Sequence, residues 1–289
     1  MIYISSSSLK EENIINILEK MRKNKISKIE LSGGTKFNKN IENELLKYKN
    51  KYNIDLMVHN YFPPPEKDFV VNIGSLNNDV YQCSINHCLR AIKLSKKIKS
   101  TKYALHAGFL IDPKVKEIGL GKKIKSNVLF DVRKSIERMK EALVILNKEA
   151  DNEVKLYLEN NVITKKNLDN FKTNPFLLTD KESFSKLKKE FDFNILLDLA
   201  HLKVSCNSLG LNFEEQANYL FDQTDYVHLS GNNALEDTNH SIFEDKSITQ
   251  FLKKKDLSKK TFTLEVYQDI SKILNDYNFL KILIEKNHN

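Results

Sequence analysis

Cysteine is scarce in this sequence, and its spacing excludes two common uses. The three cysteines, Cys83, Cys88 and Cys206, are too few for a disulfide framework and lack the Cys-x-x-Cys spacing of a metal site. This usage favours a reducing compartment, so we expect a cytoplasmic protein. Cys83 and Cys88 fall on one expected helix, where we expect both to fill apolar space.

Long apolar runs are absent as well. The apolar runs have the length of a strand, and none approaches the ~20 residues that a membrane-spanning helix needs. The first residues, Met1-Ile2-Tyr3-Ile4 followed by four serines, lack the basic start and apolar core of a secretory signal. We therefore expect a protein without a membrane partner.

Arginine is nearly missing from a chain that is otherwise basic. The formal net charge is +8, yet only four of the 46 basic residues are arginine, at positions 22, 90, 133 and 138. Arginine is the preferred side chain for two-point contacts with phosphate. The charge therefore favours solubility more than it favours binding to a polyanion such as nucleic acid.

What the sequence does contain is a regular alternation of short apolar runs and longer amphipathic stretches. The runs expected to be strands are Ile2–Ile4, Ile29–Leu31, Ile54–Val58, Tyr103–Leu105, Val154–Leu158, Ile195–Leu197, Tyr226–Leu229 and Phe262–Val266. Strands that alternate with helices form parallel sheets, and eight such units in a chain of this length match a closed barrel. We predict an α/β fold, a (β/α)8 TIM barrel with a parallel eight-stranded closed sheet, as a single domain over residues 1–289.

A doubly wound open sheet is the alternative α/β fold. It usually carries a glycine-rich phosphate loop after the first strand, but Ser5–Ser8 occupy that position without a glycine. Ser8, with Glu11 three residues later, has the pattern of a capping box. We therefore expect a helix from Ser8 to about Asn24.

Histidines and carboxylates gather where the expected strands end. Five of the seven histidines and four acids have this placement: His59, His106, His201, His228 and His240, with Glu30, Glu159, Asp198 and Glu265. In a closed barrel the carboxyl ends of the strands converge on one face, where active sites are built. Imidazole nitrogen and carboxylate oxygen together suit zinc, manganese, iron or cobalt. Without a cation, clustered acids would repel one another and lose solvation.

The pattern predicts one to three divalent ions per chain, with different roles for different side chains. The predicted metal set is Glu159, Asp198, His228 and Glu265, with His59 and His106 as ligands or substrate contacts, and with Asp237 and His240 as further candidates in the loop after the seventh strand. Glu30 is expected to support the site or to be structural. His87, in the middle of a helix, is expected to lie at the surface or in helix packing.

Aromatic residues beside the expected mouth predict where a substrate would pack. Tyr61, Phe62 and Phe109 follow the third and fourth strands, and we expect them to form an apolar wall that contacts the substrate. The run Pro63-Pro64-Pro65 favours a stiff polyproline conformation, so we expect it to shape the pocket.

Short segments at successive strand ends carry a family resemblance over nearly the whole chain. They are Ile29–Leu31, Val58–Tyr61, Val71–Ser75, Leu105–Gly108, Leu158–Asn160, Leu197–His201, Val227–Leu229 and Leu264-Glu265. In order and placement the chain resembles the xylose isomerase-like TIM-barrel superfamily. That superfamily includes sugar-phosphate isomerases and epimerases and endonuclease IV proteins.

The resemblance implies roles at matching positions. The shared metal site would use Glu159, Asp198, His228 and Glu265. In the epimerase branch the two glutamates also pass a proton to and from the reacting carbon, and the histidine of Asp-x-x-His binds substrate. Here the catalytic residues would be Glu159, Glu265 and His201, with His201 acting as the substrate contact.

The endonuclease IV branch implies a different use of the same face. There, histidines matching His59 and His106 complete a second metal site with Glu159. A third site uses an Asp-x-His pair, but this chain has Asp237-Thr238-Asn239-His240, which is one residue longer. A further branch, multinuclear-iron oxygenases that modify peptides, shares part of the loop pattern.

These observations lead to a preferred function and two alternatives. We expect a metal-dependent isomerase or epimerase acting on a small sugar or sugar phosphate. The first alternative is a metal-dependent phosphodiesterase that acts on abasic DNA, in which case DNA would be the partner. The second is a barrel that binds a sugar or a partner without catalysis. Metal content and binding to duplex DNA separate the isomerase from the phosphodiesterase. The barrel without catalysis predicts no loss of function when Glu159 is changed to Gln.

Overall fold

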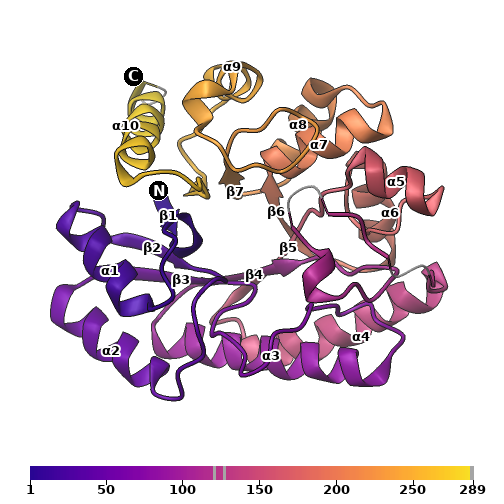
Figure 1. Ribbon diagram of the computed structural model, residues 1–289, viewed down its shortest axis with the longest axis horizontal. Coiled ribbons are helices and arrows are strands. Elements are labelled where there is room, and N and C mark those ends of the chain that lie inside the picture. Colours follow the sequence, from indigo (N-terminus) through magenta and orange to yellow (C-terminus); the bar gives the residue numbers. More distant parts are fainter. Residues whose placement is uncertain (120–121, 126–127, 287–289) are drawn as a thin grey trace.

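A closed barrel of parallel strands forms the centre of the molecule (Figure 1). The structure is a computed structural model, and it describes residues 1–119, 122–125 and 128–286. Within these ranges the barrel has eight strands: β1 (Ile2–Ser5), β2 (Lys28–Leu31), β3 (Asp55–His59), β4 (Lys102–His106), β5 (Lys155–Glu159), β6 (Asn194–Asp198), β7 (Tyr226–Leu229) and β8 (Thr261–Leu264). The predicted (β/α)8 TIM barrel is therefore confirmed.

Pairing between the first and last strands closes the sheet. β1 runs parallel to β8, with Ile2 opposite Phe262 and Ile4 opposite Leu264. An open, doubly wound sheet would leave two strands at free edges. That alternative is therefore wrong.

Helices connect the strands and surround the barrel (Figure 1). In the described ranges they are α1 (Ile14–Lys23), α2 (Ile41–Tyr52), α3 (Asn78–Lys97), α4 (Val132–Ala150), α5 (Lys165–Phe171), α6 (Lys181–Glu190), α7 (Leu199–Leu209), α8 (Phe213–Asp222), α9 (Lys246–Lys253) and α10 (Ile270–Lys286). Buried apolar residues of these helices join those of the strands in one large core. None of the helices in the described ranges is long and apolar enough to cross a membrane.

The barrel encloses a small core of its own, separate from the large core between strands and helices. Its members are Tyr3, Met57, Ala104, Tyr157, Leu196 and Tyr226. Apolar residues on the opposite sides of the same strands pack against the helices, for example Ile4 on β1 and Val58 on β3. Strands buried on both faces explain why the runs were almost continuously apolar in sequence.

The first helix starts later than its capping pattern predicted. Asn13 caps α1, because its Oδ1 accepts the N–H of Ile15 (2.9 Å). Ser8 instead ends a short 3-10 turn, where its hydroxyl donates to the carbonyl of Leu264 (3.4 Å) and accepts from the N–H of Val266 (3.2 Å). The expected cap at Ser8 is thus wrong, because tertiary contacts with the end of β8 occupy its side chain.

Two predictions about α3 had different outcomes. Cys88 is buried, as expected, but Cys83 is exposed, so its expected role in apolar packing is wrong. His87 is buried and its Nε2 donates to the carbonyl of Asn60 (2.9 Å). The expectation of a surface position for His87 is therefore wrong, and its hydrogen bond joins α3 to the loop that follows β3.

Candidate metal centre and active-site cavity

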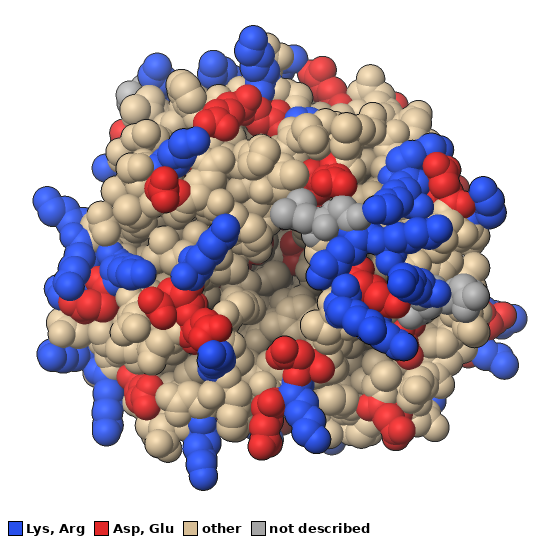
Figure 2. Space-filling view, viewed as in Figure 1, with Lys and Arg blue, Asp and Glu red and all other residues tan. Residues whose placement is uncertain are grey.

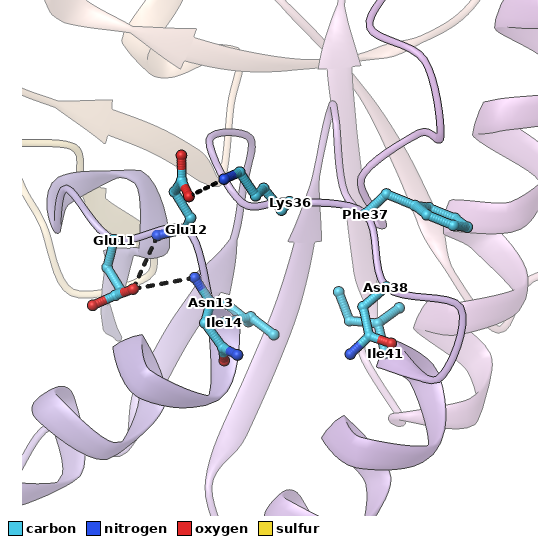
Figure 3. Close-up of a pocket in the computed structure, with 8 residues that line it drawn as sticks. All are labelled: Glu11, Glu12, Asn13, Ile14, Lys36, Phe37, Asn38 and Ile41. Atoms are coloured by element: carbon cyan, nitrogen blue, oxygen red, sulfur yellow. Dashed lines mark hydrogen bonds and ion pairs between the residues drawn. The ribbon is translucent and has the colours of Figure 1, made fainter.

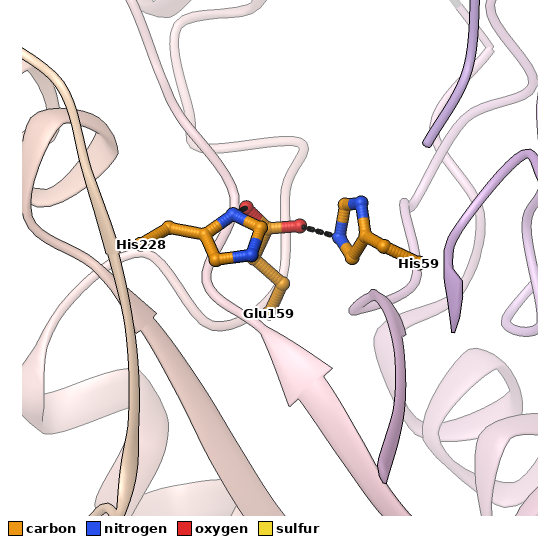
Figure 4. Close-up of side chains that lie close together, drawn as sticks. All are labelled: His59, Glu159 and His228. Carbon is orange, nitrogen blue, oxygen red and sulfur yellow. Dashed lines mark hydrogen bonds and ion pairs between the residues drawn. The ribbon is translucent and has the colours of Figure 1, made fainter. Parts of the chain in front are cut away.

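Three strand ends bring His59, Glu159 and His228 together at the carboxyl end of the barrel (Figure 4). His59 Nε2 donates to Glu159 Oε2 (2.8 Å), and His228 Nδ1 lies 3.6 Å from Glu159 Oε1. All three side chains are buried. One ligand atom from each lies within 4.8 Å of the others, which is close enough for a shared metal ion.

Glu159 also belongs to a second group, with His106 and His201. His106 Nδ1 lies 3.4 Å from Glu159 Oε2, and His201 Nδ1 lies 3.5 Å from Glu159 Oε1. The register of the sheet places His106 directly opposite Glu159 on β4 and β5. Glu159 therefore has histidines against both of its carboxylate oxygens.

A third group joins Asp198, His228 and Glu265. His228 Nδ1 lies 3.4 Å from Glu265 Oε2, and Asp198 is the register partner of His228 on β6 and β7. Asp198 Oδ1 also accepts the backbone N–H of His201 (2.8 Å) as the cap of α7. One carboxylate therefore starts a helix and faces the cluster.

Helix α7 follows β6 directly and was not expected from the sequence. The signals were present, because Asp198 is a preferred N-cap residue and Gly210 ends the helix with a positive φ of 72°. This short connection has a functional consequence: it carries His201 onto the same face as Asp198.

The loop after β7 separates the two candidate ligands that it contains. Asp237 Oδ2 lies 3.2 Å from His201 Nε2. The side chain of His240 is exposed. Its backbone is held in place by two hydrogen bonds with Gly231, from Gly231 N–H to the His240 carbonyl (2.8 Å) and from His240 N–H to the Gly231 carbonyl (2.7 Å). The structure therefore brings Asp237 to the cluster and leaves His240 outside it, contrary to the expectation for His240.

Burial and neighbouring charges shift the pKa values in the cluster. Burial raises the pKa of Asp198 to about 7, with Asp237 adding to the rise and His201 opposing it. Burial lowers the pKa of His106 to about 4, against the opposite pull of Glu159. A neutral imidazole such as His106 has a free lone pair, which is the form that binds a metal ion.

Glu265 is held by two side chains that the sequence analysis missed. Its Oε1 accepts hydrogen bonds from the hydroxyl groups of Ser7 (2.9 Å) and Tyr267 (2.8 Å). Burial disfavours the carboxylate, but the hydrogen bond and charge of His228 lower the pKa of Glu265 to about 2. Ser7 and Tyr267 could have been found from their positions in the sequence, because both follow the carboxyl ends of strands.

Asn160 was also missed as a positioning residue, although it belongs to one of the segments that carry the resemblance. Its Oδ1 accepts the N–H of Asp198 (2.7 Å), and its Nδ2 donates to the carbonyl of Asp198 (3.0 Å). Its own carbonyl accepts from His201 Nδ1 (3.0 Å). Asn160 thus fixes Asp198 and His201 relative to Glu159.

The donor atoms of the cluster fit a divalent metal ion. Among the buried polar atoms that lack a hydrogen-bond partner in the described part of the chain, four belong to the candidate ligands: His106 Nδ1, Glu159 Oε1, His228 Nδ1 and Asp237 Oδ1. Buried polar atoms are normally paired, so a group of unpaired ones needs an explanation. A mixed set of nitrogen and oxygen donors suits zinc, manganese, iron or cobalt.

A cavity of about 650 Å³ opens above the cluster. Its floor includes His59, His106, Glu159, His201 and Glu265. Figure 2 shows a hollow near the centre of this face, with both acidic and basic side chains around it. The size and the mixture of apolar and polar lining are typical of a site for a small molecule.

The predicted aromatic wall is only partly present. Tyr61 and Phe109 line the cavity, and Phe176 packs edge-to-face against Phe109 with 5.2 Å between ring centroids. Phe62 is fully buried in the core between strands and helices and does not line the cavity. The expected substrate contact of Phe62 is therefore wrong, because consecutive residues of this loop face different environments.

A second, smaller cavity of about 260 Å³ lies between the loops that follow β1 and β2 (Figure 3). Residues that line it include Glu12, Lys36 and Phe37. Glu12 and Lys36 form an ion pair across it. Five of the metal-ligand candidates line the larger cavity instead, namely His59, His106, Glu159, Asp237 and Glu265, so the larger cavity is the candidate active site.

The fold and the cluster define a barrel with a polar, metal-compatible mouth. Residues 19–283 match the model of the xylose isomerase-like TIM barrel family, and the chain belongs to that family. The comparison with curated proteins yields no match.

Several solved structures share the fold of the whole chain. A D-tagatose 3-epimerase-like protein is 18% identical, with a TM-score of 0.73 over 99% of this chain and 98% of that one. An L-ribulose 3-epimerase is 14% identical, with a TM-score of 0.66 over 99% and 95%. Endonuclease IV from Thermus thermophilus is 12% identical, with a TM-score of 0.60 over 99% of both chains. The neighbours thus include both epimerases and an endonuclease.

Proposed function

We propose that this chain is a divalent-metal-dependent isomerase or epimerase of a sugar or sugar phosphate. One observation carries the proposal. Glu159 and Glu265, from the ends of β5 and β8, both approach His228 Nδ1, at 3.6 and 3.4 Å. Two carboxylates that share one metal-compatible position can also serve one reacting carbon.

The residues that would hold the cation are Glu159, Asp198, His228 and Glu265. When bound, a divalent cation supplies positive charge that makes a C–H beside a carbonyl more acidic. His59, His106 and Asp237 would complete a second ion site or contact the substrate. The unpaired atoms His106 Nδ1 and Asp237 Oδ1 support such a role.

The proposed chemistry is a proton transfer at a carbon that bears a hydroxyl group and adjoins the carbonyl. Glu159 or Glu265 removes the proton, and the same or the other carboxylate returns it. Ser7 and Tyr267 hold Glu265 in place through its Oε1. His201 would contact a substrate hydroxyl group.

The remaining cavity lining suits a sugar. Phe109 and Tyr61 offer apolar surface to the C–H groups of a sugar ring, while the floor offers polar groups. The epimerases among the structural neighbours add support for this substrate class.

Cleavage of abasic DNA is the second candidate. The observation that favours it is that His59 and His106 also lie beside Glu159. With them, the site has more candidate ligands than the four needed for one ion. Against it, the hollow in Figure 2 is bordered by acidic as well as basic side chains, and the chain has only four arginines. A duplex needs many cationic phosphate contacts.

The test combines metal content with hydrogen exchange. Purified protein is analysed for bound metals and then incubated in D2O with a panel of ketoses, aldoses and their phosphates. We expect bound divalent metal and deuterium incorporation beside a carbonyl, lost in Glu159→Gln. Cleavage of an abasic duplex without exchange into any sugar would contradict the isomerase proposal and favour the nuclease.

A further inference from the structure

Glu30 is a carboxylate in an unexpected place, inside the barrel beneath the metal-ligand cluster. It lies on β2 and is fully buried. Of the residues that the structure describes, His228 is the only basic side chain that pairs with it. Burying a carboxylate without a lysine or arginine is unfavourable unless hydrogen bonds and a nearby positive charge offset the lost hydration.

The contacts of Glu30 converge on His228. His228 Nε2 lies 2.9 Å from Glu30 Oε1 and 3.2 Å from Oε2, so its N–H faces the carboxylate. The hydroxyl group of Thr263 donates to Oε2 (2.8 Å), and the hydroxyl group of Tyr226 donates to the same oxygen. Three donors from β7 and β8 therefore fix the direction of this carboxylate.

This arrangement determines which nitrogen of His228 is available to the cluster. A carboxylate accepts and does not donate, so Nε2 carries the hydrogen. Nδ1 is the atom that lies beside Glu159 and Glu265, so it is the nitrogen that would offer its lone pair to a metal ion held by those carboxylates. Rotating the ring by half a turn would remove the Glu30 contact and turn Nδ1 away from both glutamates.

We propose that Glu30 is a positioning residue that orients His228, so that Nδ1 of His228 faces a metal ion. Tyr226 and Thr263 hold Glu30 in the position that this role requires. This inference rests on the proposed metal-dependent function. The positive charge of a bound ion, transmitted through the imidazole, offsets the cost of the buried carboxylate. Carboxylates that accept from a ligand histidine make that histidine a stronger ligand, and losing one typically weakens metal binding about 10–100-fold.

The experiment compares zinc affinity in three proteins, each freed of metal by chelation. Glu30→Gln keeps the shape of the side chain and removes its charge. Thr263→Val keeps the shape of a neighbour and removes one donor to Glu30 without touching His228. We expect zinc Kd to rise about 10–100-fold in Glu30→Gln and only a few-fold in Thr263→Val.

A spectroscopic measurement separates orientation from general damage. In the zinc-loaded wild type, ¹⁵N spectra of the histidines are expected to show the His228 hydrogen on Nε2 with zinc on Nδ1. In Glu30→Gln we expect this signature to be lost or broadened while the far-UV circular dichroism stays unchanged. A structural role alone would alter the fold and leave the tautomer of zinc-bound His228 as it was.

The possible results distinguish this inference from the function on which it rests. If wild type and Glu30→Gln bind zinc equally and share one His228 signature, Glu30 does not position the ligand and the inference is overturned. If the wild type binds no zinc, manganese, iron or cobalt, the proposed function fails, and this inference fails with it.

Discussion

The side-chain amide of Asn72 binds both backbone polar groups of Phe109. Asn72 Oδ1 accepts the N–H of Phe109 (2.9 Å), and its Nδ2 donates to the carbonyl of Phe109 (3.1 Å). The same Nδ2 also faces the carbonyl of Ile111 (3.0 Å) and the carboxylate of Asp112 (2.8 Å). One asparagine therefore joins the loop after β3 to the loop after β4 and holds an aromatic residue of the cavity wall.

Replacing Asn72 should destabilise the protein strongly. Asn72 is buried, so Asn72→Ala leaves several backbone groups without partners, and we expect a loss of about 2–4 kcal/mol in the free energy of unfolding. Urea unfolding measures it. The control is Asn86→Ala on α3, which is exposed and should change stability by less than about 0.5 kcal/mol. Equal losses in both variants would contradict the role given to Asn72.

Replacing Glu159 should remove bound metal. Glu159 belongs to two of the three candidate ligand groups, so Glu159→Gln should weaken metal binding by more than the roughly 10–100-fold typical of a supporting residue. Elemental analysis after dialysis is the measurement. Glu153→Gln, at an exposed carboxylate paired with Lys96, is the matched control and should retain full metal content. Retention of metal by Glu159→Gln would rule out the proposed ligand set.

Replacing His201 should affect metal binding or turnover, whereas replacing His240 should not. His201 ends the Asp-x-x-His motif, and His240 lies in the loop after β7. His201→Ala should lower metal affinity or turnover, because His201 contacts both Glu159 and Asp237. His240→Ala should leave zinc affinity within about twofold, since His240 is exposed and lies outside the cluster. Isothermal titration with zinc tests both variants. Loss of affinity in His240→Ala would mean that the loop closes over the cluster when metal binds.

Gly231 should tolerate no side chain. A Cβ atom there would lie 2.6 Å from the carbonyl oxygen of Ser241, which is backbone and cannot swing aside. We expect Gly231→Ala to lower the free energy of unfolding by about 1–3 kcal/mol. Gly33→Ala is the control, because its Cβ would meet Tyr61 Cβ at an ordinary 3.4 Å. Thermal unfolding measures the stability of both variants. Equal stability would contradict the prediction, because it would show that the loop after β7 shifts to accommodate the added Cβ atom.

Acid should destabilise the end of the barrel opposite the cavity through Asp225. Burial disfavours this carboxylate, but hydrogen bonds from Lys102 (2.8 Å) and Tyr157 (2.8 Å) lower the pKa of Asp225 below its ordinary 3.8. A lowered folded-state pKa stabilises the protein above the unfolded-state value, and that stabilisation is lost as pH falls through the folded-state value.

The matching experiment follows melting temperature from pH 7 down to pH 3. Wild type should lose more stability than Asp225→Asn below about pH 4, because the variant has no carboxylate to protonate there. Asp68→Asn, at an exposed carboxylate, serves as the control. Parallel curves for wild type and Asp225→Asn would show that the contacts of Asp225 contribute nothing to acid stability.

Prediction from the sequence was most successful where a local pattern repeats. Alternating apolar runs and amphipathic stretches indicated eight strands with helices between them, and the closed barrel follows from that count. Strand ends are equally regular. Because every parallel strand points the same way, the residues that end β5, β6, β7 and β8 had to meet at one mouth.

Prediction failed where two local signals compete or where a loop decides. Ser8 and Asn13 are both suitable helix caps by residue type, and only the contact of Ser8 with the end of β8 selects Asn13. Tyr61 and Phe62 are adjacent aromatics, yet one lines the cavity and the other is buried in the core.

The barrel and the strand-end positions of its histidines and acids could therefore be predicted from sequence, because periodicity and strand direction are local properties. Which side chains meet depends on contacts between distant segments. Lys203 on α7 pairs with Asp245 (2.6 Å) and binds the carbonyl of Asn232 (2.8 Å), which anchors the loop after β7 at both its ends. Contacts between residues this far apart in the chain leave no local sequence pattern. The sequence of the loop alone therefore could not predict that Asp237, rather than His240, faces the cluster.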